Sequence, residues 1–186
     1  MNIPNLLTLI RILLIPVLVL FYCIPTAWGH AVAAIIFGIA ALTDWLDGYL
    51  ARNLDQGTRF GAFLDPVADK LMVAVALVLV VGEANQIWLS IPAAVIIARE
   101  ILISGLREWM AEIGQRKQVS VNVIAKVKTT SQMLALLMLL FYEPDAFLWV
   151  KLFGLLLLYV SAILTLWSMV IYLKIAWSDL TLSTNQ

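Results

Sequence analysis

Four aspartates at helical spacing stand where two apolar segments end: Asp44, Asp47, Asp65 and Asp69. The first two are three residues apart and the last two are four apart, so each pair lies on one face of a helix. Because the linker between the segments is short, we expect two antiparallel neighbouring helices whose acidic faces meet. Carboxylates held together repel one another, and bound divalent cations relieve that repulsion. The spacing therefore predicts a cation site.

The chemistry of the predicted ligands narrows the choice of cation. They are carboxylates with no histidine or cysteine nearby in the sequence, which favours Mg²⁺, Mn²⁺ or Ca²⁺ over Zn²⁺. Two such cations can clamp a phosphate group and stabilise both its attacking and its leaving oxygens. Two other roles fit the acids alone: a divalent-cation or proton path in a transporter, or a structural cluster neutralised by basic neighbours.

Small residues accompany the aspartates at fixed offsets. Gly48 and Gly61 lower helix propensity, and what these glycines and Ala51 provide is close approach of the backbone to a bulky ligand or to a neighbouring helix. Arg52 lies one turn beyond Gly48, where a guanidinium can hold a phosphate by paired hydrogen bonds. The pattern favours a phosphate-bearing substrate beside the cations.

The composition places these residues in a membrane protein. The chain has 186 residues, of which 63% are hydrophobic, whereas soluble domains are about half apolar. The formal net charge is zero, so no overall field favours a nucleic-acid partner. We expect a single domain over residues 1–186.

Six apolar segments are each long enough to cross a bilayer, which takes about 20 residues. They cover residues 5–24, 31–51, 61–82, 87–107, 123–142 and 147–173. Residues 1–11 either begin the first helix or form a separate amphipathic helix at the membrane surface; we favour the second, because Pro4 suits a helix start and Arg11 is costly at depth. The last segment suits either a homodimer face or contact with membrane lipids.

Basic residues set the orientation. Lys and Arg are absent from the short loops near 25–30, 83–86 and 143–146, but they are frequent near 52–60 and 107–128. Basic loops stay in the cytoplasm. The sequence thus predicts an all-α integral membrane protein with six transmembrane helices, both termini in the cytoplasm, and the acidic site at the cytoplasmic end.

Two further cations lie inside apolar segments, where an unpaired charge is costly. Lys70 follows Asp69 directly, and Arg99 stands about two turns inside its segment. Each is expected either to pair with a nearby acid or to contact a substrate. Other basic residues lie in the next loop, beside the acidic site. This basic cluster predicts an anionic acceptor that carries its own phosphate.

The pattern D-x2-D-G-x2-A-R-x8-G-x3-D-x3-D, from Asp44 to Asp69, resembles the signature of the CDP-alcohol phosphotransferase family of membrane enzymes. The resemblance implies that two divalent cations, Mg²⁺ or Mn²⁺, are held by the four aspartates, with Asp69 touching one of them and acting as general base. It also implies a site for the CDP moiety. That site is expected to include Gly48, Ala51, Arg52 and Gly61. Asn5, Thr8 and Arg11 share one helix face and either pack there or cover the nucleotide.

Further stretches resemble the bacterial members of this family that use glycerol 3-phosphate: residues 4–11, 64–70, 99–108 and 126–132. The candidates for the acceptor phosphate are Arg99, Arg107, Lys126 and Lys128. The resemblance implies transfer of a phosphatidyl group from CDP-diacylglycerol to glycerol 3-phosphate at a bacterial inner membrane, releasing CMP. The alternatives within the family are inositol phosphate, serine or phosphatidylglycerol as acceptor, the last giving a cardiolipin synthase.

Overall fold

The structure is a computed structural model. It describes residues 3–54, 59–112, 122–141 and 148–183, with side chains described in residues 6–26, 28–44, 61, 64–106, 108–110, 126–141 and 148–174. Across these residues the chain is all α-helical. The helices are α1 (Ile3–Tyr22), α2 (Ala27–Leu54), α3 (Arg59–Ala84), α4 (Ile87–Glu112), α5 (Asn122–Phe141) and α6 (Leu148–Ser183).

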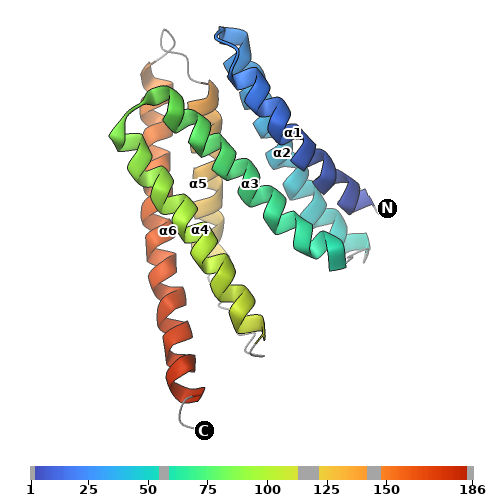
Figure 1. The fold of residues 1–186 in the computed structure, drawn as a ribbon, viewed down its shortest axis with the longest axis vertical. Coiled ribbons are helices and arrows are strands. Elements are labelled where there is room, and N and C mark those ends of the chain that lie inside the picture. Colours follow the sequence, from blue (N-terminus) through green and yellow to red (C-terminus); the bar gives the residue numbers. More distant parts are fainter. Residues whose placement is uncertain (1–2, 55–58, 113–121, 142–147, 184–186) are drawn as a thin grey trace.

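Helix α3 runs diagonally between two groups of helices (Figure 1). On one side it packs along α1, which also packs along α2; on the other side it meets α4 and α5. The most extensive contact in the molecule is between α5 and α6. Helices α2 and α3 are antiparallel, as expected, but they touch each other little, because α1 packs against both of them. The prediction that they are close neighbours is therefore correct only near their acidic ends.

The prediction of a separate surface helix over residues 1–11 is wrong. Helix α1 continues without a break from Ile3 to Tyr22, past Pro16. The argument from the cost of burying Arg11 fails because its guanidinium is paired: Arg11 is 1% exposed, and its Nη1 donates to Oδ1 of Asp44 at 2.9 Å. A paired guanidinium can lie in the interior where an unpaired one cannot.

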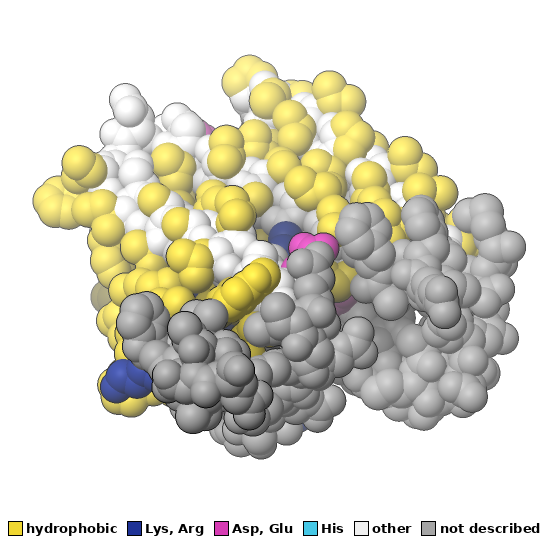
Figure 2. All heavy atoms as spheres, turned by 60° about the horizontal axis from the view of Figure 1, so that its bottom comes forward, with side chains coloured by type: hydrophobic (Ala, Val, Ile, Leu, Met, Phe, Trp, Pro, Cys, Tyr) yellow, Lys and Arg dark blue, Asp and Glu magenta, His cyan; other side chains and the backbone are white. Residues whose placement is uncertain are grey.

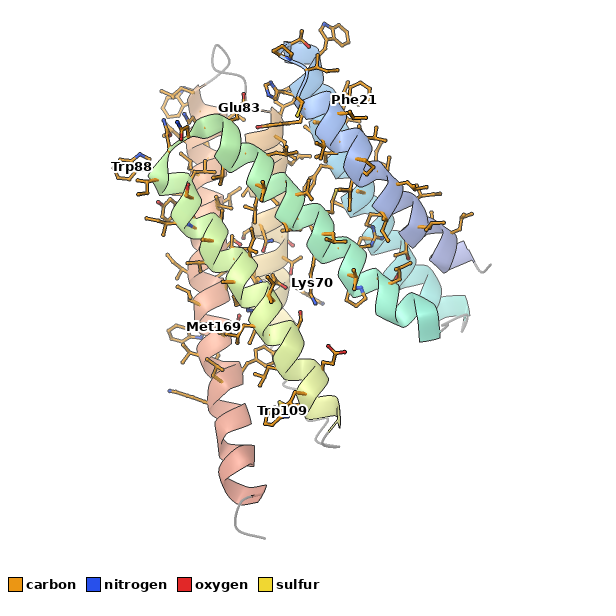
Figure 3. The ribbon with its side chains drawn as sticks, in the orientation of Figure 1. Phe21, Lys70, Glu83, Trp88, Trp109 and Met169 are labelled. Atoms are coloured by element: carbon orange, nitrogen blue, oxygen red, sulfur yellow. The ribbon has the colours of Figure 1, made fainter. Side chains whose placement is uncertain are left out.

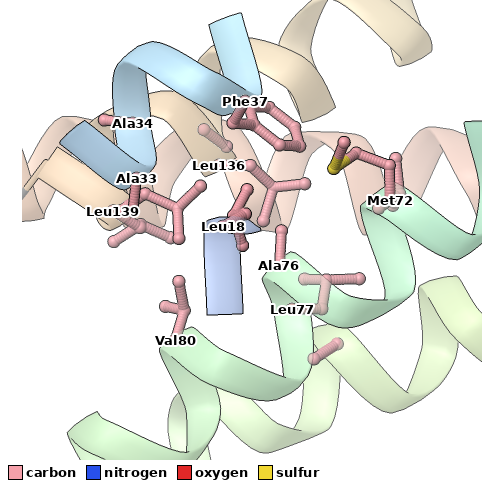
Figure 4. Packing of buried hydrophobic residues seen from close by; sticks show 14 of the residues in the cluster. Leu18, Ala33, Ala34, Phe37, Met72, Ala76, Leu77, Val80, Leu136 and Leu139 are labelled. Atoms are coloured by element: carbon pink, nitrogen blue, oxygen red, sulfur yellow. The ribbon is translucent and has the colours of Figure 1, made fainter. Parts of the chain in front are cut away.

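All six helices contribute apolar side chains to the interior. Leu18, Phe37, Leu77 and Leu136 are almost fully buried and meet at its centre (Figure 4). Large apolar side chains also cover the outside, including Trp28 at 81% exposed and Trp149 at 71%. So large an apolar surface is suited to an apolar surrounding rather than to water.

Among the described residues, two helices are long and apolar enough to cross a membrane, by length and composition. They are Ile87–Met110 and Leu148–Lys174, and two shorter apolar helices cover Leu6–Tyr22 and Trp28–Asp44. These segments are taken over the residues whose side chains are described, which in α2 end at Asp44.

Polar side chains also close the end of the bundle opposite the acidic one. Tyr22 of α1 donates to the carboxylate of Glu83, and Nε2 of His30 lies 3.2 Å from the same carboxylate. The rings of Tyr22 and His30 meet edge to face, with centroids 4.8 Å apart. Because Glu83 lies near the C-terminus of α3, this cluster ties α3 to α1 and α2 at that end.

The corner between α1 and α2 requires glycine. A Cβ on Gly29 would lie 2.5 Å from the carbonyl oxygens of Phe21 and Ile24, which are backbone atoms and cannot rotate away as a side chain can.

We expect Gly29→Ala to destabilise the protein by about 1–3 kcal/mol, measured as a lower thermal unfolding midpoint in detergent. Gly82→Ala is the control, since no atom lies within 4 Å of its added Cβ; it should be neutral or stabilising by up to about 1 kcal/mol. Equal effects of the two variants would contradict this account.

Candidate functional site

Helix α1 contacts the acidic residues directly. Thr8 donates its hydroxyl to Oδ1 of Asp65 on α3, while Arg11, one turn further along α1, pairs with Asp44 on α2. Thr8 and Arg11 are fully buried or nearly so. Their three-residue spacing puts both on one helix face, and that face joins the acidic ends of α2 and α3. These residues were expected either to pack against neighbouring helices or to cover the nucleotide. Their described contacts are with aspartates of α2 and α3.

Asp69 lies one turn beyond Asp65 on α3 and interacts with charges on both sides. Its carboxylate interacts electrostatically with those of Asp44 and Glu100, and with the cations of Arg11 and Lys70. It is therefore the residue that connects the α1–α2 side of the molecule with the α4–α6 side. Gly61 is buried near the start of the same helix.

Several predicted site residues have side chains outside the described ones. They are Asn5 on α1, Asp47, Gly48, Ala51 and Arg52 on the C-terminal part of α2, and Arg107 on α4. All six lie on helices, including Arg52, which the sequence placed in the loop after the second helix. For these six residues, the expected roles in binding metal, nucleotide and acceptor stay predictions.

A cavity of about 250 Å³ opens beside Asp69. Its wall comes from α3, α4, α5 and α6. The lining residues are Asp69, Lys70, Val73, Arg99, Glu100, Lys128, Thr129, Gln132, Met133, Ser168 and Tyr172. Figure 3 shows Lys70 extending from α3 into this region, and Figure 2 shows acidic and basic side chains together near the middle of the end that is lowest in Figure 1. Three cations and two carboxylates thus line one polar cavity.

Glu100 is the centre of the charged network in the cavity wall. Its Oε1 accepts from Nη1 of Arg99 at 3.1 Å and from Nζ of Lys128 on α5. Arg99 and Lys128 are 8% and 7% exposed, respectively. The carboxylate pairs with both cations, which lowers the cost of burying them inside an apolar bundle.

Lys70 is held by a chain of two hydrogen bonds. Its Nζ donates to Oγ of Ser104 on α4, and that hydroxyl donates to the backbone carbonyl of Glu100 at 2.6 Å. Lys70 was expected either to pair with a nearby acid or to contact a substrate. Its described hydrogen bond is instead to a hydroxyl, and it lies in the cavity wall, where contact with a substrate stays a prediction. The neighbours Asp69 and Lys70 therefore bring opposite charges to the same cavity.

Arg99 joins α4 to α6. Its Nη2 donates to Oγ of Ser168 at 2.8 Å, and its guanidinium carbon lies 6.0 Å from the centroid of the Tyr172 ring. At that distance the cation can interact with the face of the ring. The ion pair with a helix neighbour that was considered for Arg99 is confirmed by its contact with Glu100, while its contact with a ligand stays a prediction.

Sequence reasoning missed the contribution of α6 to this cavity. Ser168 and Tyr172 line it, and a signal for them exists: Ser161, Thr165, Ser168 and Tyr172 follow one another at offsets of four, three and four. Such spacing marks a polar stripe along an apolar helix.

Lys126, a candidate for the acceptor phosphate, is exposed and does not line the cavity. It precedes Lys128 by two residues and so lies on another face of α5.

The donor chemistry at the acidic end fits a hard divalent cation. Asp44, Asp65 and Asp69 supply carboxylate oxygens there, and Oδ1 of Asp44 and Oδ1 of Asp65 accept hydrogen bonds from α1. Among the described side chains, no three acidic, histidine or cysteine groups lie close enough together to hold an ion. The fourth predicted ligand, Asp47, lies outside those side chains.

Comparison with known proteins gives the family. The chain matches the family described as CDP-alcohol phosphatidyltransferase over residues 1–173. The chain belongs to this family. It is 58% identical over 179 residues to a relative from Salmonella choleraesuis (strain SC-B67) and 56% identical over 179 residues to one from Escherichia coli (strain K12). Both alignments cover 96% of this chain and 97% of the relative, and both relatives are named CDP-diacylglycerol–glycerol-3-phosphate 3-phosphatidyltransferase. Membership of a transferase family gives no support to the transporter considered from the acids alone.

Proposed function

We propose that this protein transfers the phosphatidyl group of CDP-diacylglycerol to sn-glycerol 3-phosphate, giving phosphatidylglycerophosphate and CMP. The observation that carries the proposal is the cavity beside Asp69, where Lys70, Arg99 and Lys128 offer positive charge to an acceptor that bears a phosphate. The names of the two relatives agree with this reaction. Of the acceptors considered, serine carries no phosphate for these cations to bind.

The acceptor end of the reaction follows from the chain's own residues. The cations bind the phosphate of glycerol 3-phosphate and turn its primary hydroxyl toward Asp69. Asp69 takes the proton of that hydroxyl, and the oxygen attacks the phosphorus that bears diacylglycerol. The bond from that phosphorus to the oxygen bridging it to CMP breaks, and CMP leaves with the electron pair. Holding the reactants in line contributes much of the rate in such a transfer.

The donor end of the reaction would need divalent cations, Mg²⁺ or Mn²⁺. Asp44, Asp47, Asp65 and Asp69 would hold two of them, and the bound cations would neutralise charge on the diphosphate and on the leaving CMP. Arg11 meanwhile offsets the charge of Asp44 from the side of α1. Gly48, Ala51, Arg52 and Gly61 would receive the CDP moiety, with α1 covering it.

The substrates fix where the site would lie in a membrane. Glycerol 3-phosphate is water-soluble, whereas the diacylglycerol chains stay in the bilayer. All six helices would cross the inner membrane, with the acidic end and both termini in the cytoplasm, since the basic loops are at that end. The exposed apolar side chains of α6, Phe153 and Trp167 among them, suit lipid or a second copy of the chain.

An acceptor screen tests the proposed function. Purified protein in detergent receives labelled CDP-diacylglycerol, Mg²⁺ or Mn²⁺, and one alcohol at a time: glycerol 3-phosphate, inositol phosphate, serine or phosphatidylglycerol. We expect CMP release with glycerol 3-phosphate and little with the others. Preferential release with another alcohol would overturn the acceptor assignment. Full activity in excess chelator would overturn the dependence on metal.

A further inference from the structure

The carboxylate of Glu100 faces the cavity as well as pairing with the cations of its wall. Within the described part of the chain, Glu100 and Asp69 are the two carboxylates that line the cavity. All the ion-pair contacts given for Glu100 engage one oxygen, Oε1, which accepts from both Arg99 and Lys128. Its backbone carbonyl anchors Ser104, and through Ser104 also Lys70. The carboxylate is therefore held by two cations, from α4 and from α5.

The second oxygen of Glu100, Oε2, has no hydrogen-bond partner among the described residues. A phosphate oxygen placed against it would be repelled, since both carry negative charge. A hydroxyl placed there would instead donate a hydrogen bond to an ionised acceptor, which is among the stronger hydrogen bonds in proteins. The cavity is thus complementary to a phosphate ester that also carries a hydroxyl.

We propose that Glu100 is a specificity-determining residue that accepts a hydrogen bond from the non-reacting hydroxyl of the acceptor. The inference rests on the proposed function, in which glycerol 3-phosphate presents two hydroxyls on adjacent carbons. Asp69 and Glu100 are close enough to interact electrostatically. Asp69 takes the proton of the primary hydroxyl, and Glu100 binds the secondary hydroxyl next to it. The cations of the wall then hold the phosphate.

The wild-type protein provides the first test. We compare kcat/KM for glycerol 3-phosphate with that for 3-hydroxypropyl phosphate, which keeps the phosphate and the reacting hydroxyl but lacks the secondary one. We expect a preference for glycerol 3-phosphate of about 10- to 100-fold, the effect of one hydrogen bond to a charged group. Equal use of the two acceptors, within about twofold, would overturn the proposal. Failure to use glycerol 3-phosphate, with turnover of another alcohol, would instead overturn the proposed function.

A pair of variants separates recognition from positioning. Glu100→Ala should reduce the preference to within about threefold, because the acceptor oxygen is gone. Ser104→Ala removes the anchor of Lys70 but leaves the carboxylate, so it should slow both acceptors by the same factor and keep the wild-type preference. If Glu100→Ala retained the wild-type preference, Glu100 would be only a counter-ion. The wild-type comparison decides the question even if that variant does not fold.

Discussion

Replacing Asp69 with Asn is expected to lower the rate of CMP release by about 10²- to 10⁴-fold, the usual effect of losing a general base. Asn has almost the same shape as Asp but cannot take up the proton of the attacking hydroxyl. Asp69 lines the acceptor cavity and faces Asp44 across the acidic end, so no other described carboxylate occupies the same place. The measurement is the initial rate of CMP release at saturating CDP-diacylglycerol and glycerol 3-phosphate.

The matched control is Glu83→Gln, which neutralises another acid of the same helix at the opposite end of the bundle (Figure 3). Its carboxamide can still accept from Tyr22, so the rate should stay within about threefold of wild type. Binding of Mn²⁺ to the Asp69→Asn variant, followed by electron paramagnetic resonance, shows whether the cation site survives. A variant that still binds the cation and keeps near-wild-type turnover would remove Asp69 from the role of base.

Replacing Lys128 with Ala should raise the KM for glycerol 3-phosphate by about 10- to 100-fold, since one hydrogen bond to a charged group contributes about 1.5–3 kcal/mol. Lys128 is buried in the cavity wall, and its loss would also leave Glu100 with Arg99 as its only partner in the described ion-pair network. The KM for CDP-diacylglycerol should change less than about threefold, because the proposed donor site is on the other side of α3. Steady-state kinetics with each substrate varied in turn measure both values.

Lys126→Ala is the informative comparison. Both lysines stand near the start of α5, but the side chain of Lys126 is exposed and does not line the cavity. Its removal should raise the KM for glycerol 3-phosphate much less than removal of Lys128. Lys151→Ala, at the other end of the bundle, controls for the loss of a lysine as such. If Lys126→Ala and Lys128→Ala raised this KM equally, the acceptor phosphate would lie outside the cavity.

The helices could be predicted from sequence because their signals are local. Each helix appears in the sequence as a long apolar run, and turn-forming residues mark where the run ends. Asn85, with φ of 43°, lies between the end of α3 and the start of α4. The aspartate spacing is also a local signal, since it depends on residues a few positions apart. Asp65 and Asp69 stand one turn apart on α3, while the shared face of Asp44 and Asp47 stays a prediction because the side chain of Asp47 lies outside the described ones.

Contacts between distant helices could not be predicted in the same way. The sequence placed Arg11 at the membrane surface because it gave no sign that Asp44, 33 positions away, would be its partner. Lys126 and Lys128 looked equivalent until the rotation of α5 was known. The wall contributed by α6 needed the packing of α6 against α4 and α5, since Ser168 alone is an ordinary polar residue in an apolar helix.

Helix α3 contributes to both sides of the proposed site through residues that lie within two turns of one another. Asp65 belongs with α1 and α2, while Lys70 belongs with α4, and Asp69 lies between them. In the proposed function, the α1–α2 side of the bundle handles the activated lipid and the α4–α6 side handles the alcohol, with α3 as the border between them. A mutant library aimed at a new alcohol should therefore cover the cavity-lining positions of α4, α5 and α6 together with Lys70 of α3, and should keep Asp44, Asp65 and Asp69 unchanged.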